Sequence, residues 1–305
     1  MGFRNLAIKI LFLSQTTTGI LGNFSLLIYY LVYYIQHALK PTDLILMHLM
    51  ASNALIVLSA GIPHTLAAFE LKQFLNDFGC RLILYIQSVG RSVSISTTCL
   101  LSVFQAITIS HRESCCNDQK VNAAKYIGCS IFSLWVLFII IHFIFFVYIL
   151  VKRNSKNMTR IRNFEYCSFG GGDDINASLY TALAVCPEIF FSLLIAWSSV
   201  FMIVILYRHK QRFQHIHSNT VYSRISPESR ATQKILVLVC TFLAFFTISS
   251  VLKGCISHLH NLNWWFVNIT RLTSLCFPSF GPFVLMSHCT FMPRLSLIWI
   301  RNKIS

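Results

Sequence analysis

The chain has 305 residues, of which 55% are hydrophobic and only 11% are charged. Soluble domains carry about 25% charged residues, so this composition excludes a protein whose surface lies mostly in water. The net charge of +15 does not indicate nucleic-acid binding, because the basic residues lie in short blocks between apolar runs and not on one continuous face. Membrane lipid with anionic head groups is the better partner for some of them.

Seven long apolar stretches follow one another along the chain, and a membrane-spanning helix needs about 20 mostly apolar residues. We predict each stretch as a helix, because lipid offers no partner to unpaired backbone groups. The pattern predicts an all-α membrane protein, a seven-transmembrane helix bundle that forms a single domain over residues 1–305. The predicted helices cover about 10–35, 43–67, 82–110, 126–151, 185–207, 234–257 and 264–288.

The first two stretches contain asparagines that could bond between helices. The first stretch is too long for a cleavable signal peptide and predicts a signal anchor. Asn23 lies inside it, beside Gly22, and Asn53 lies in the second stretch. Small and polar residues hold membrane helices together. Each asparagine therefore has a structural role open to it, and a direct role in a ligand pocket or switch as the alternative.

Arg91 in the third stretch is the most informative single residue. It lies eleven positions after Cys80, which at ~1.5 Å per residue places it ~16 Å deep, near the bilayer centre. A cation there costs at least ~2.5–3.5 kcal/mol and must face the bundle interior. Arg91 is either part of a ligand pocket or switch, or a structural arginine. The candidate neighbours are Asn53, Ser88 and Ser94.

The polar connection 151–184 indicates the orientation of the chain. It contains the glycosylation sequons Asn157-Met-Thr and Asn176-Ala-Ser, and glycans are added on the lumenal side of the membrane. The Lys and Arg residues on the two sides of the membrane are nearly balanced in number, so they do not decide the matter. The sequons predict an extracellular N-terminus and a cytoplasmic C-terminus.

Cysteines at the outer ends of the predicted helices suggest a disulfide. Cys80 lies just before the third helix and Cys167 lies in the sequon-bearing connection. A bridge between them would tie this connection across the mouth of the bundle in an oxidising compartment. Cys186 and Cys255 also lie near outer helix ends, so the residues alone leave the pairing open.

Charged residues near the outer ends of two further helices could border a pocket. Glu188 begins the fifth stretch and Lys253 lies near the end of the sixth. Each is either a pocket-rim charge or a solvated helix end. His64 and His142 stand alone in apolar stretches, and no second ligand lies at a metal-binding spacing from either, so we predict no metal site.

The connection 208–233 is basic and faces the cytoplasm in this orientation. Such a loop could dock a G protein or lie on the membrane surface. Ser226-Pro227 has the pattern of a helix start and predicts a sixth helix that extends beyond the membrane. The candidate G-protein-facing residues, with one from the preceding cytoplasmic connection, are Arg112, Arg208, Lys210, Arg212 and Arg230.

Signatures of catalysis and ion-coupled transport are missing from the sequence. It contains no Walker loop, no G-x-S-x-G, no H-E-x-x-H and no pair of membrane-buried carboxylates. Ion-coupled transporters usually carry an intramembrane carboxylate or broken helices in matched halves. We therefore predict neither an enzyme nor a cofactor, and a small transporter is the less favoured alternative to a receptor.

Several segments resemble the type-1 vomeronasal (pheromone) receptors, and the resemblance runs nearly end to end. The sequences of these segments indicate a family far more specifically than hydropathy does. The chain lacks the Asp-Arg-Tyr triplet of most rhodopsin-like receptors, and Pro282 alone matches their Asn-Pro-x-x-Tyr motif. The resembling segments are 40–46 (KPTDLIL), 97–110 (TTCLLSVFQAITIS), 209–218 (HKQRFQHIHS), 226–233 (SPESRATQ) and 276–287 (CFPSFGPFVLMS).

The resemblance implies a rhodopsin-like G-protein-coupled receptor in the plasma membrane. It implies a small, pheromone-like ligand and a heterotrimeric G protein of the Gi/o class as partners. It also implies a disulfide between Cys80 and Cys167, a glycan on Asn157, and that Arg91 occupies the family's arginine in the third helix. Bitter-taste receptors, another seven-helix family without the usual triplet, are the alternative.

Overall fold

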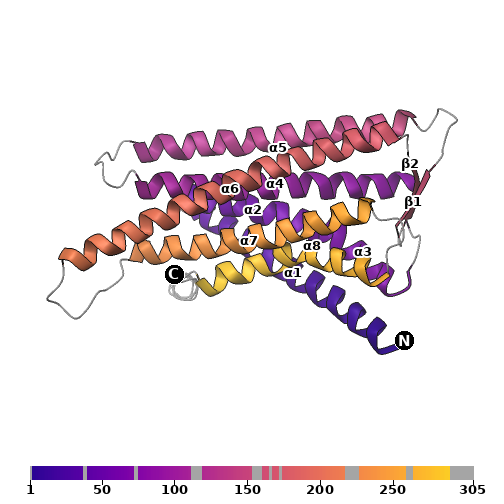
Figure 1. Cartoon of the computed structure of the whole chain (residues 1–305), viewed down its shortest axis with the longest axis horizontal. Coiled ribbons are helices and arrows are strands. Elements are labelled where there is room, and N and C mark those ends of the chain that lie inside the picture. The colour runs from indigo at the N-terminus through magenta and orange to yellow at the C-terminus, as the bar shows by residue number, and fades with distance from the viewer. Residues whose placement is uncertain are drawn as a thin grey trace.

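The structure is a computed structural model of the chain. It describes residues 2–36, 40–71, 75–110, 119–152, 160–164, 167–171, 174–216, 227–258 and 264–288. Seven helices in this part are long and apolar enough to cross a membrane, which confirms the predicted bundle. Most of them run along the long axis of the molecule, and α1 crosses the others obliquely (Figure 1). The elements are α1 (Gly2–Gln36), α2 (Pro41–Ile56), η1 (Val57–Gly61), α3 (Ile62–Ala68), α4 (Asp77–Ser110), α5 (Gln119–Lys152), β1 (Arg160–Phe164), β2 (Cys167–Gly171), α6 (Asp174–Ile216), α7 (Pro227–His258) and α8 (Trp264–His288).

The second span is one apolar segment of three pieces. It runs over Pro41–Ala68, and the π-helical turn η1 separates α2 from α3. Pro63 follows η1 within the first turn of α3. A proline inside a helix removes a backbone donor and clashes with the preceding turn, and a widened π turn is one way to accommodate this irregularity.

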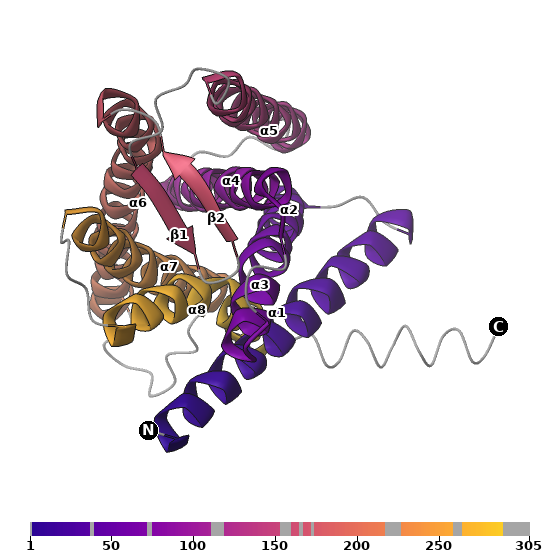
Figure 2. The ribbon, with the colours of Figure 1, turned by 90° about the vertical axis from the view of Figure 1, so that its right-hand side faces the viewer.

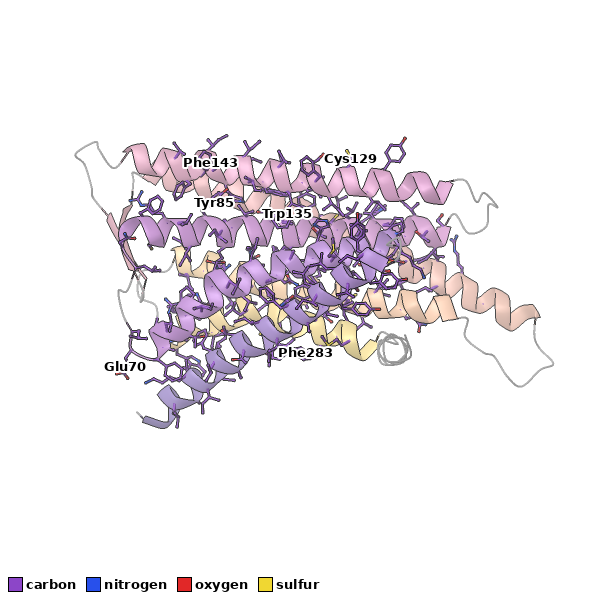
Figure 3. The ribbon with its side chains drawn as sticks, turned by 180° about the vertical axis from the view of Figure 1, so that it is seen from behind. Glu70, Tyr85, Cys129, Trp135, Phe143 and Phe283 are labelled. Atoms are coloured by element: carbon purple, nitrogen blue, oxygen red, sulfur yellow. The ribbon has the colours of Figure 1, made fainter. Side chains whose placement is uncertain are left out.

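The α4 helix lies at the centre of the bundle. It packs against α2, α5, α6 and α7, and the view along the bundle shows α5 at the periphery (Figure 2). Phe143 and Cys129 point outward from α5, whereas Tyr85 and Trp135 lie between α4 and α5 (Figure 3). The outward face of α5 is apolar, with Phe132 70% exposed. Hydrocarbon stabilises such a face, which water would not.

The α1 and α8 helices are joined where a proline leaves a carbonyl free. Pro282 has no N–H to donate to the carbonyl of Pro278, four residues earlier. Asn23 Nδ2 on α1 donates to this Pro278 oxygen at 2.7 Å and to the Gly19 oxygen at 2.8 Å. Asn23 therefore has the structural role that was one of the two open to it.

Four helices, α1, α5, α6 and α7, extend well beyond the predicted ranges, because a helix can continue past its apolar segment. The α6 helix begins at Asp174 instead of about 185, and α1 begins at Gly2 instead of about 10. The α7 helix begins at Pro227, as the Ser226-Pro227 pattern predicts.

The connection between α5 and α6 contains an antiparallel hairpin of β1 and β2 that the sequence analysis did not predict. The hairpin crosses one end of the bundle (Figure 2), and β2 packs against α4. This is the end at which α1 begins (Figure 1).

Candidate functional site

Arg91 on α4 forms an ion pair with Glu188 on α6. Its Nε donates to Glu188 Oε1 at 2.5 Å, and its Nη2 donates to Glu188 Oε2 at 3.4 Å. The two side chains are only 15% and 16% exposed. Because two N–H groups on one edge of the guanidinium meet the two oxygens of the carboxylate, the pair fixes the orientation of the two helices as well as their separation.

Two serines and a phenylalanine of α7 complete this charged cluster. Arg91 Nη1 donates to Ser249 Oγ at 3.3 Å and Nη2 donates to Ser250 Oγ at 2.8 Å. Ser250 in turn donates to Glu188 Oε2 at 3.1 Å. The guanidinium lies 4.2 Å from the ring centroid of Phe246, a cation–π arrangement. One cluster thus links α4, α6 and α7.

A chain of aromatic contacts leads from this cluster to α8. The ring of Phe246 stacks on Phe242 with centroids 5.3 Å apart, and Phe242 meets the ring of Phe277 edge-on at 4.5 Å. Such pairs contribute about 0.5–1.5 kcal/mol beyond their buried area. Phe277 immediately precedes the helix-interior Pro278 of α8. These contacts connect Arg91 to a proline inside α8.

Prolines lie beside the charged cluster on α6 and on the neighbouring helix α8. Pro187 lies within α6 directly before Glu188, and Pro278 of α8 lines the adjacent cavity. Each proline removes one intrahelical hydrogen bond. Both helices therefore lack one backbone hydrogen bond close to the site.

A small cavity adjoins Arg91, between α4, α7 and α8. Its volume of about 30 Å³ has room for about two water molecules, so a larger ligand must push the helices apart. The lining combines one aromatic wall with a few polar groups, as ligand sites usually do. The lining residues are Ile56, Gln87, Arg91, Ser94, Phe242, Phe245, Phe246, Ser249, Lys253, Thr273, Ser274, Phe277 and Pro278.

The structure distinguishes the predicted neighbours of Arg91. Ser94 Oγ donates to Asn53 Oδ1 at 3.0 Å, so these two residues bond to each other, and Ser94 lines the cavity. Asn53 is fully buried and positions Ser94. Glu188, which the sequence left as a rim charge or a solvated helix end, is the ionic partner of Arg91.

Sequence reasoning missed the α7 side of this cluster. Ser249, Ser250 and Phe246 stand in an apolar stretch where serine and phenylalanine are ordinary residues. One signal was available: Lys253 follows Ser249 by four positions and Ser250 by three, so all three share a helix face. A polar face on an otherwise apolar span indicates that it points to the interior.

Cys80 lies at the start of α4, fully buried and disulfide-bonded. Cys186 and Cys255, the alternatives left open by the sequence, are free thiols. Cys167 begins β2, the strand that packs against α4, but its side chain lies outside the described residues. Its pairing with Cys80 stays a prediction.

The remaining predicted residues lie at the two ends of the bundle. Asn176 is in the first turn of α6, near the hairpin, and Asn157 and Arg112 lie outside the described residues. The α6 helix ends and α7 begins at the opposite end of the bundle (Figure 1). These two helix ends carry Arg208, Lys210, Arg212 and Arg230.

Comparison with known proteins gives matches over almost the whole chain. Residues 6–296 match the model of the vomeronasal organ pheromone receptor family. Vomeronasal type-1 receptor 4 of Pongo pygmaeus and that of Homo sapiens are each 44% identical to this chain over 290 residues, which is 95% of this chain and 96% of the relative. Vomeronasal type-1 receptor 45 of Mus musculus is 32% identical over 251 residues, 82% of this chain and 77% of the relative.

These matches, with seven membrane spans around a buried charged cluster, define the class of the protein. It is a multi-pass membrane protein, a chemosensory receptor of the G-protein-coupled type and not an enzyme. The chain belongs to the type-1 family of vomeronasal organ pheromone receptors, as the resemblance of its motifs predicted.

Proposed function

We propose that this receptor binds a small, pheromone-like molecule at the Arg91 cluster and signals through a heterotrimeric G protein of the Gi/o class. The observation that carries the proposal is the contact of Arg91 with Glu188, Ser249 and Ser250 beside a cavity. A buried ion pair is stable only while its geometry and hydrogen bonds are intact. A ligand that enters the cavity competes for these bonds and shifts the balance between two helix arrangements.

The α7 helix transmits this change to the opposite end of the bundle. It is continuous from Pro227 to His258, so Ser249 and Pro227 are ~33 Å apart at ~1.5 Å per residue. Much of its apolar span faces outward, with only 28% of it buried, and the rest packs against α4, α6 and α8. A small rotation at Ser249 and Ser250 therefore displaces the Pro227 end.

The basic ends of α6 and α7 form the surface for the G protein in this proposal. In this proposal the receptor lies in the plasma membrane with its N-terminus outside. The cytoplasmic surface then includes Arg208, Lys210, Arg212 and Arg230. Anionic lipid would contact the same residues when no G protein is bound. The choice of the Gi/o class rests on the family resemblance.

Nucleotide exchange on purified G proteins tests the proposal. Receptor in lipid nanodiscs is mixed with Gi, Go or Gs, and a panel of odorant-type molecules is added. We expect at least one molecule to accelerate exchange on Gi or Go and none to act on Gs alone. Acceleration confined to Gs, or binding of ligand without exchange on any of the three, contradicts the proposal; the second result would favour a transporter.

A further inference from the structure

The charges around the Arg91 cavity do not balance. Both oxygens of Glu188 are engaged by Arg91 and Ser250, so the one carboxylate beside the cavity is already paired. Lys253 also lines the cavity. It is half-buried and makes no hydrogen bond or ion pair within the part of the chain that the structure describes.

The charges of Arg91 and Glu188 both act on Lys253. Arg91 already holds both oxygens of Glu188. Two cations therefore share one carboxylate among the described residues beside the cavity. A half-buried ammonium without a counter-ion is unfavourable, so an anion placed beside it gains more than a neutral group does.

The rest of the lining determines what the anion must be attached to. Phe242, Phe245, Phe246 and Phe277 form an aromatic wall next to the cations. Aromatic and aliphatic surfaces stabilise an apolar body by burial. Gln87 and Thr273 add neutral hydrogen-bonding groups.

We propose that this site selects a small amphiphilic organic anion, with a carboxylate or similar head group on an apolar body, and that Lys253 receives the head group. The inference rests on the function proposed above and names the chemistry of its ligand. Lys253 is thus a specificity-determining residue. The competing role for Lys253 is structural: it lies three residues before Ile256, the end of the apolar span, and its stem could carry the ammonium to the lipid head groups.

Matched ligand pairs separate these roles. The receptor is placed in nanodiscs of phosphatidylcholine alone, so that no anionic lipid competes. Binding is measured by ligand-dependent thermal stability for 3-phenylpropionate against 3-phenylpropanol, and for decanoate against decanol. The first pair reaches the site from water and the second from the membrane, so their difference identifies the source of the ligand.

The expected result is an anion preference that depends on Lys253. We expect the wild-type protein to bind a carboxylate about tenfold or more tightly than its matched alcohol, the gain of a hydrogen bond to a charged group. Lys253→Gln should reduce this ratio to near one while alcohol affinity stays within about twofold. Lys253→Arg, which keeps the charge, should retain the preference. Lys9→Gln is the matched control, because Lys9 pairs with the exposed Glu70 at 2.9 Å and should behave as wild type.

Three results overturn the inference. They are equal or tighter binding of the alcohols, failure of both carboxylates to bind, and an anion preference that survives in Lys253→Gln as the structural role predicts. The wild-type comparison decides even if Lys253→Gln fails to fold. Binding needs no G protein, so failure of this inference and failure of nucleotide exchange are separate outcomes.

Discussion

Arg91 and Glu188 illustrate how a membrane bundle holds charges at depth. Moving either ion out of water costs several kcal/mol, and their attraction compensates only when the remaining donors and acceptors are satisfied. Here Ser249, Ser250 and the Phe246 ring satisfy them. Removal of one partner leaves the other as an uncompensated charge, so the two residues must be tested together.

We expect Arg91→Ala to abolish the response to ligand while the receptor still reaches the cell surface. The methyl side chain of alanine has no donors to hold Glu188 and the α7 serines in one cluster. Arg91→Lys should not restore the full response, because a point-like ammonium cannot reproduce the planar fork of five donors. Surface staining beside a G-protein assay measures both properties in the same cells.

Two controls sharpen the Arg91 experiment. The double variant Arg91→Gln with Glu188→Gln removes the stranded carboxylate, so it should reach the surface at least as well as Arg91→Ala and remain unresponsive. The exposed pair of Lys9 and Glu70 is the matched ion pair, worth about 0–1 kcal/mol, and Lys9→Gln should change neither property. Retention of Arg91→Ala inside the cell would show a scaffold role, and a normal response would exclude both roles.

At the scale of the elements, α1 and α8 pack closely because Gly22 of α1 has no side chain. A Cβ on Gly22 would lie 2.9 Å from Pro282 Cβ and 3.2 Å from the Phe283 ring. Both helices are seen side by side near Phe283 (Figure 3). The Pro282 side chain cannot move away from an added Cβ, because its ring is closed onto the backbone nitrogen.

We therefore expect Gly22→Ala to destabilise the receptor by about 1–3 kcal/mol, the usual cost of overpacking. Gly128 is the matched control, since a Cβ there meets only Leu44 at 3.8 Å. Gly128→Ala should be neutral or stabilise by up to about 1 kcal/mol through helix propensity. Thermal unfolding of the purified proteins in one detergent measures the difference. Equal melting temperatures for the two variants would show that α1 and α8 move apart at little cost.

Strand β2 of the hairpin packs against α4. We predict that a disulfide between Cys80 and Cys167 also ties the hairpin to α4. Such a cross-link typically stabilises a fold by about 2–4 kcal/mol. Cys80→Ser and Cys167→Ser should lower surface expression to a similar extent, and the double variant should be no worse than either. Mass spectrometry of the unreduced protein checks the linkage directly. Strongly additive defects would show that the two cysteines have different partners.

At the scale of the whole molecule, the arrangement of apolar surface follows from the solvent. The second and third spans are 67% and 61% buried, whereas the fourth, Tyr126–Val147, is only 17% buried. Polar groups gather inside, around α4, and apolar side chains cover the outside. The apolar outer surface distinguishes this bundle from a water-soluble one, and the buried polar groups follow because hydrocarbon offers no hydrogen bonds to them.

We predict that the hairpin end of the bundle is extracellular and that the ends of α6 and α7 opposite it are cytoplasmic. Seven spans then place the N-terminus outside and the C-terminus inside. Epitope tags at both termini, probed before and after permeabilisation, check this. Labelling of the C-terminal tag on intact cells would reverse the orientation. Loss of an endoglycosidase-sensitive mass shift in Asn157→Gln or Asn176→Gln would show independently which sequon faces the lumen.

The sequence by itself determined the number of spans, their approximate positions, the inward orientation of Arg91 and the family. These follow from local properties: apolar length must match bilayer thickness, and an intramembrane cation must face inward. The start of α7 at Pro227 was also predicted, because capping and proline preferences act within one turn.

Only the tertiary structure decided which side chains meet Arg91. Glu188, Ser249 and Ser250 are 97 to 159 positions away, and nothing local relates their helices. The sequence favoured near neighbours such as Ser94, yet Ser94 bonds to Asn53, because the rotation of α4 against α2 turns it that way. Helix rotation and packing are properties of the whole bundle, so the partners of a buried charge are decided there and not along the chain.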